Sequence, residues 1–157
     1  MVNGIALARK NRDARPVRYV HEATVQANYA SLTMIRTGLV VLLYIAYHLL
    51  HFTVGVTNPE HFALADAAGR HDVFGMLVRG FQNPLISAVY LLANFVLAVH
   101  LSHGIRSAIQ TFGWSHPSYN PLIRKGGPAL AWLLFVGFAS IPTAVLLGIV
   151  KFESAPL

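Results

Sequence analysis

Residues 84–110 read PLISAVYLLANFVLAVHLSHGIRSAIQ, and this stretch decides the fold. Its only Lys, Arg, Asp or Glu is Arg106. A helix of about 20 apolar residues crosses the hydrocarbon core of a bilayer, which is about 30 Å thick. The stretch therefore predicts a transmembrane helix. His100 and His103 lie near its end and require a separate explanation.

Two further apolar stretches, at about 31–56 and about 128–150, approach the same length. The chain is 55% hydrophobic and 11% charged, and its mean hydropathy of +0.52 exceeds that of ordinary soluble domains. We therefore predict an all-α transmembrane helical bundle with three spans. The expected organisation is a polar segment at 1–30 and a transmembrane domain at 31–157. Apolar residues at helical spacing in 73–81 indicate a short additional helix at the outer surface.

The net charge of the chain is +6, and its basic residues are concentrated before the first span and between the second and third spans. Such segments remain on the cytoplasmic side of a membrane. The distribution predicts a multi-pass protein of the cytoplasmic (inner) membrane whose N-terminal segment is cytoplasmic. The sequence contains no cysteine, which excludes disulfides, thiolate metal sites and cysteine nucleophiles.

Histidines occur inside two of the predicted spans: His48 and His51 in the first, His100 and His103 in the second. An ionisable group is costly inside a bilayer and usually serves a ligand or a partner there. At a rise of about 1.5 Å per residue, His48 lies about 7 Å from the middle of its span toward the outer side. His100 lies about 5 Å from the middle of its own span toward the cytoplasm. If they bind haem iron, they are expected to serve two irons. His51 and His103 are second candidates.

A histidine in a membrane helix can also simply form a hydrogen bond with a neighbouring helix. Spacing alone leaves this reading and haem ligation equally open. The remaining histidines lie in polar connections and are expected to be solvated: His21, His61, His71 and His116.

Several motifs together resemble the single-chain cytochrome b subunit that anchors succinate dehydrogenase and fumarate reductase in the membrane. They are MIRTG (34–38), YHLLHF (47–52), VHLSHGIRSAIQTFG (99–113), HPSYNPLIRK (116–125) and NRDARPVRY (11–19). Members of this family have five membrane helices that hold two b-type haems and exchange electrons with quinone. A flavoprotein and an iron–sulfur subunit bind them on the cytoplasmic side.

The resemblance implies that the three spans correspond to the last three of the five helices and that the first two have no counterpart here. It places the axial ligand of the outer haem at His48 and that of the inner haem at His100. The expected cofactors are haem b, up to two per family member, with quinone as redox partner. The expected partners are the flavoprotein subunit, the iron–sulfur subunit and the lipid membrane, and no nucleic acid.

The predicted function is a haem-binding anchor subunit of succinate:quinone oxidoreductase that passes electrons between the iron–sulfur subunit and quinone. No catalytic residue is expected, because the chain lacks a recognisable nucleophile, carboxylate pair or nucleotide-binding loop, so dicarboxylate chemistry must lie on a partner. Two alternatives remain open. One is a haem-free membrane scaffold or transporter subunit, and the other is the cytochrome b of another quinone-linked dehydrogenase.

Overall fold

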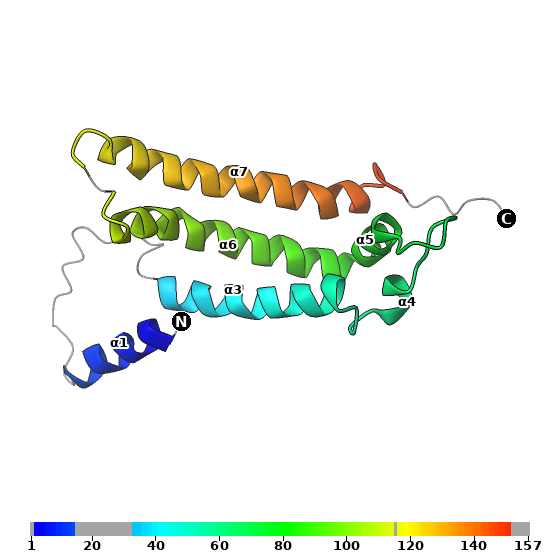
Figure 1. The fold of residues 1–157 in the computed structure, drawn as a ribbon, viewed down its shortest axis with the longest axis horizontal. Helices are drawn as coiled ribbons and strands as arrows, with labels where there is room; N and C mark the ends of the chain where they lie inside the picture. The colour runs from blue at the N-terminus through cyan, green and yellow to red at the C-terminus, as the bar shows by residue number, and fades with distance from the viewer. Residues whose placement is uncertain (1, 15–32, 115, 152–157) are drawn as a thin grey trace.

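The computed structural model describes residues 2–14, 33–114 and 116–151 (Figure 1). Within these ranges the regular structure is helical, apart from an isolated β-bridge between Ala65 and His71. The predicted all-α class is confirmed. In chain order, the helices are α1 (Val2–Asp13), α3 (Met34–His48), the π-helix η1 (Leu49–Thr53), α4 (Pro59–Phe62), α5 (Val73–Gln82), α6 (Pro84–Thr111) and α7 (Asn120–Leu146).

Three helices are long and apolar enough to cross a membrane, as the sequence predicted. They are α3 with η1, which together span Met34–Thr53, then α6 and α7. Figure 1 shows α6 in the middle, with α3 along one side and α7 along the other. The predicted first span began at residue 31, but residues 31 and 32 lie outside the described residues. The same holds for 15–30 of the predicted N-terminal segment, which includes His21.

The third helix, α7, begins at Asn120 and ends at Leu146, whereas the apolar stretch in the sequence runs from about 128 to about 150. The helix starts earlier because Pro121 in its first turn has no N–H to leave unpaired and already has a helical φ. Its first two turns are polar and do not register as apolar sequence. Gly148, at φ 69°, lies just beyond the last turn, where the left-handed conformation ends a helix.

Two short helices, α4 and α5, lie at the end of the bundle where α3 ends and α6 begins (Figure 1). The Asp72 carboxylate accepts a hydrogen bond from the Gly75 N–H at 2.8 Å and so caps α5. The Asn83 side chain caps α6 in the same way, by accepting from the Leu85 N–H. Helix α5 confirms the helix predicted at 73–81, and it buries its apolar face against α6 and α7.

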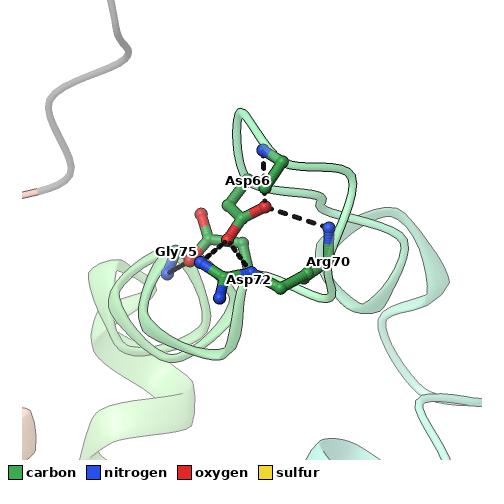
Figure 2. Close-up of polar contacts among 5 residues, drawn as sticks. Asp66, Arg70, Asp72 and Gly75 are labelled. Carbon is green, nitrogen blue, oxygen red and sulfur yellow. Dashed lines mark hydrogen bonds and ion pairs between the residues drawn. The ribbon is translucent and has the colours of Figure 1, made fainter.

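The connection between α4 and α5 is organised around the Asp66 carboxylate, as Figure 2 shows. Its oxygens accept hydrogen bonds from the Ala68 N–H, the Arg70 N–H and the Arg70 Nε–H, each at 2.9 Å. The backbone N–H and then the guanidinium of Arg70 lower the pKa of Asp66 below its ordinary value of 3.8. Because a carboxylate accepts these bonds better than a carboxylic acid does, ionised Asp66 favours the closed turn.

The turn is therefore expected to be intact above the ordinary pKa of an aspartate and to loosen as the pH falls through the lowered pKa of Asp66. An NMR titration of the Asp66 carboxyl carbon is expected to give a midpoint below 3.8. In Arg70→Ala, which keeps the backbone N–H but removes the guanidinium, the midpoint should move back toward the ordinary value. A midpoint at or above 3.8 in the unaltered chain contradicts this account of the turn.

Candidate functional site

Three hydrogen bonds between side chains connect the first membrane helix to α6, and we call the six residues that form them the polar seam. The first joins Thr37 Oγ1 and His100 Nδ1 at 3.0 Å. In the second, the Tyr44 hydroxyl donates to Asn94 Oδ1 at 3.2 Å, and the third joins His51 Nδ1 and the Tyr90 hydroxyl at 3.0 Å. The bonds lie at three successive heights along the two antiparallel helices.

The Thr37 hydroxyl defines which nitrogen of His100 carries the proton. Thr37 Oγ1 lies 3.1 Å from the Thr33 carbonyl oxygen and 3.2 Å from that of Met34, so its single proton is donated within its own helix. We infer from these two contacts that the oxygen accepts a hydrogen bond from the His100 Nδ1–H, with 3.0 Å between Oγ1 and Nδ1. This assignment leaves His100 Nε2 unprotonated, with a lone pair available to a metal.

His100 lines a cavity of about 370 Å³ between α1, α3 and α6. Gly38 also lines this cavity, because a residue without a side chain leaves space on the face of α3. The other lining residues are mainly aliphatic: Ile5, Met34, Ile35, Leu42 and Ile45, together with Gly4. The cavity thus combines one imidazole with apolar walls, and its volume falls in the range of about 300–1,000 Å³ typical of ligand pockets.

His48 lines a second cavity, of about 390 Å³, enclosed by residues of α3, η1, α5, α6 and α7. Its ring lies about 6 Å, centroid to centroid, from each of three aromatic rings, those of Tyr44, Phe52 and Tyr90. Within the described part of the chain, no residue forms a hydrogen bond with either ring nitrogen of His48. His48 is therefore accessible from the cavity and not committed to a protein partner there.

The two cavities lie at different heights, as the sequence-based depth estimate anticipated. His100 lies beside Thr37, and Thr37 precedes His48 by eleven residues on the same helix. At about 1.5 Å per residue, this places the two imidazoles about 16 Å apart along the bundle axis. A group bound to one histidine is thus expected to be separate from a group bound to the other.

His51, predicted as a second candidate, has a different environment from that of His48. It is 2% exposed, its ring stacks on Phe52 with centroids 4.0 Å apart, and its Nδ1 is paired with Tyr90. A Cβ built on Gly80 of α5 would lie 3.1 Å from the Phe52 ring and 3.5 Å from the His51 ring. The Nε2 of His51 is buried and has no hydrogen-bond partner among the described residues. The close packing leaves no space beside this nitrogen for a flat macrocycle.

The remaining histidines of the described residues lie outside these two cavities. His103 lines neither the His48 cavity nor the His100 cavity, although it lies one turn from His100. His116 accepts a hydrogen bond from the Ser118 N–H, and His71 packs against Phe62. His61 differs from the solvated state expected for it, because its Nδ1 is buried and unpartnered in the described part of the chain. These positions show no shared ligand geometry.

Sequence reasoning identified His48 and two of the seam residues, His100 and His51. It missed the other four seam residues, Thr37, Tyr44, Tyr90 and Asn94. A signal was present on one helix: Thr37, Tyr44 and His51 recur every seven residues and so share a face. Their partners on α6 are separated by six and then four residues, which conceals the correspondence until the helices are placed together.

Together these features define a multi-pass membrane protein with two separate cavities, each bordered by one histidine. The profile of a family described as the succinate dehydrogenase/fumarate reductase transmembrane subunit matches residues 8–143. The chain belongs to this family. It is therefore a membrane subunit of succinate dehydrogenase or fumarate reductase, and it associates with the other subunits of that complex and with the lipid bilayer. Comparisons with curated proteins and with solved structures found no match.

Replacing Tyr90 by Phe should destabilise the bundle, because the change removes the partner of His51 Nδ1 and keeps the aromatic ring. The expected loss is about 1 kcal/mol of unfolding free energy, measured by reversible unfolding in detergent. Tyr47→Phe is the matched control. Tyr47 contacts both His51 and Tyr90, but its hydroxyl has no hydrogen-bond partner in the described residues. Equal effects of the two changes would contradict a contribution of this hydrogen bond.

Replacing Thr37 by Val should release His100 Nδ1, because valine has the same shape but cannot accept a hydrogen bond. In the chain without cofactor, ¹⁵N NMR of labelled histidine is expected to show His100 protonated at Nδ1 and a mixture of tautomers in Thr37→Val. Thr37→Ser keeps the hydroxyl and should resemble the unaltered chain. Identical tautomer signals in the unaltered chain and in Thr37→Val would refute the assignment.

Proposed function

We propose that this chain is the haem-binding, electron-transferring anchor subunit of a succinate:quinone oxidoreductase. Family membership supports the complex, and the two histidine cavities support haem binding. The observation that carries the proposal is the hydrogen bond between Thr37 and His100. A histidine that ligates a metal usually donates its other N–H to a fixed acceptor, which sets the ring orientation and the tautomer.

The residues present fit haem b. His100 offers Nε2 to an apolar cavity, and the Thr37 hydroxyl holds its ring in place. His48 offers a ring without protein hydrogen bonds to the second cavity, whereas His51 is too closely packed to reach a macrocycle. Within the described residues no three His, Cys, Asp or Glu side chains cluster into a metal site. A porphyrin supplies four nitrogens itself, so it requires only an axial ligand from each histidine.

When bound, haem b supplies a one-electron carrier whose iron alternates between the ferrous and ferric states. The chain's own residues would hold the haem, orient it and shield it from water. The aliphatic walls around His100 and the aromatic residues around His48 exclude water and lower the local dielectric, which influences a redox potential. His48 and His100 would each supply one imidazole nitrogen to a haem iron.

Two histidines at different heights fit a pathway across the membrane. Basic residues are concentrated where α3 begins, where α6 ends and where α7 begins, and such residues favour the cytoplasmic side of a membrane. This distribution supports an orientation in which that end of the bundle faces the cytoplasm. His100 is nearer that end than His48 is. In this orientation, His100 would hold a haem nearer the flavoprotein and iron–sulfur subunits, and His48 would hold a haem nearer the outer side.

Substitution of either histidine is expected to remove one of the two haems from the assembled complex. His48→Ala and His100→Ala should each lower haem b per complex by about half, measured from the reduced-minus-oxidised spectrum of the purified complex. The reason is that each histidine lines a different cavity.

His103→Ala is the matched control, because His103 lies one turn from His100 on α6 but borders neither of the two cavities. It should leave the haem content unchanged. A complex that retains its full haem content in both alanine variants would contradict ligation by His48 and His100. A complex with no b-type signal even in the unaltered chain would instead favour a haem-free scaffold.

A further inference from the structure

A third cavity, of about 250 Å³, lies where the end of α6 meets the beginning of α7. Two arginines line it, Arg106 from α6 and Arg124 from α7. The other lining residues are Gln110, Pro117, Asn120, Pro121 and Ile123. The cavity is separate from those of His48 and His100 and shares no lining residue with them.

Arg106 and Arg124 are the only charged residues that line this cavity, so its charge is positive. Neither arginine forms an ion pair with a carboxylate in the described part of the chain. Guanidinium groups bind phosphate oxygens through two parallel hydrogen bonds, and two such groups on adjacent helices can hold one phosphate between them. The first turn of α7 also lines the cavity, and the positive end of its dipole favours the same charge. The chemistry fits a phosphate-bearing anion.

The depth of the cavity indicates the source of that phosphate. Arg106 lies 22 residues after Pro84, the first residue of α6, which is about 33 Å along the helix. The hydrocarbon core is about 30 Å thick, so Arg106 lies at its boundary, where lipid phosphates are located. Exposed aromatic side chains flank the same region, namely Phe112, Trp114 and Tyr119. Tryptophan and tyrosine are enriched at this interface of membrane proteins.

An exposed apolar residue completes the pattern. Leu122, in the first turn of α7 beside the cavity, is 74% exposed. A soluble anion would gain nothing from this side chain, whereas the acyl chain of a lipid whose phosphate lies in the cavity would cover it.

We propose that this cavity binds the headgroup phosphate of an anionic phospholipid, with Arg106 and Arg124 as its ligands. The lipid links the end of α6 to the start of α7 at the membrane boundary. This site does not depend on haem binding, because none of its residues borders either histidine cavity.

The test uses the full chain, carrying Trp132→Phe so that Trp114 is the sole tryptophan, in nanodiscs of phosphatidylcholine and phosphatidylglycerol. Phosphatidylglycerol or phosphatidylcholine with brominated acyl chains is added in turn, and quenching of Trp114 gives the relative binding of the two lipids. Phosphatidylglycerol is expected to bind more tightly. Arg106→Gln and Arg124→Gln should each reduce this preference about tenfold, the effect expected for the loss of a charge-assisted hydrogen bond to phosphate.

Lys125→Gln is the matched control, because it removes the same charge from the neighbouring position of α7 and Lys125 does not line the cavity. It should change the preference by less than about twofold. Arg106→Lys keeps the charge and loses the planar fork, so an intermediate preference is expected. Circular dichroism verifies that each variant is folded.

Three results would overturn the proposal. The first is an equal preference for the two lipids in the unaltered chain, and the second is a loss in Lys125→Gln as large as in the arginine variants. The third is abolition of the preference by 50 mM inorganic phosphate, in contrast to an equal ionic strength of chloride, which would assign the cavity to free phosphate.

Discussion

The arrangement of this bundle depends on one constraint: a polar side chain between helices in a membrane must find a partner within the protein. Water is absent there, and an unpaired polar group is costly. The polar seam pairs one side-chain atom of each member at three heights, through Thr37 with His100, Tyr44 with Asn94, and His51 with Tyr90. Only His51 Nε2 is left buried and unpaired among the seam residues. Apolar packing alone permits α3 to slide or rotate against α6, because Leu, Ile and Val contacts in lipid are largely interchangeable. The seam selects one register and one rotation.

That register determines which histidines can reach a ligand. The face of the first membrane helix that carries Thr37, Tyr44 and His51 packs on α6. His48 lies off this seam and borders the aromatic cavity. His51 lies on the seam, and its Nδ1 is hydrogen-bonded to Tyr90. On α6, His100 is itself a seam residue, yet only its Nδ1 is used and its Nε2 remains available. The same set of hydrogen bonds thus supports the fold and prepares one imidazole for a metal. Separating the two roles requires a change, such as Thr37→Val, that keeps shape and removes the acceptor.

The sequence was sufficient for the fold class and for the number of membrane helices, because both follow from the length and hydropathy of 84–110 and its two neighbours. It was less informative at the helix ends. Asn120 begins α7 well before the apolar residues begin, since backbone hydrogen bonding continues through Arg124 and Lys125 whatever their polarity. Likewise, His48 and His100 could be selected by their depth, but Thr37 could not. Threonine is common in membrane helices, and its significance arises only from its contact with a residue 63 positions away.

The end of the first membrane helix shows why depth alone could not distinguish His48 from His51. The α-helix changes at Leu49 into the π-helix η1, and the Val54 N–H donates to the Leu49 carbonyl five residues earlier at 2.8 Å. A π turn holds more residues than an α turn, so it alters the direction of every side chain that follows. His48 is the last residue before this change, and His51 lies within it. The wider turn lies against α5, where Gly80 leaves room for Phe52 and His51. Two histidines three residues apart therefore acquire different chemistry: one borders a cavity, and the other is enclosed by aromatic rings. Hydropathy and α-helical spacing contain no information about such a turn, which depends on the small residue that α5 presents to it.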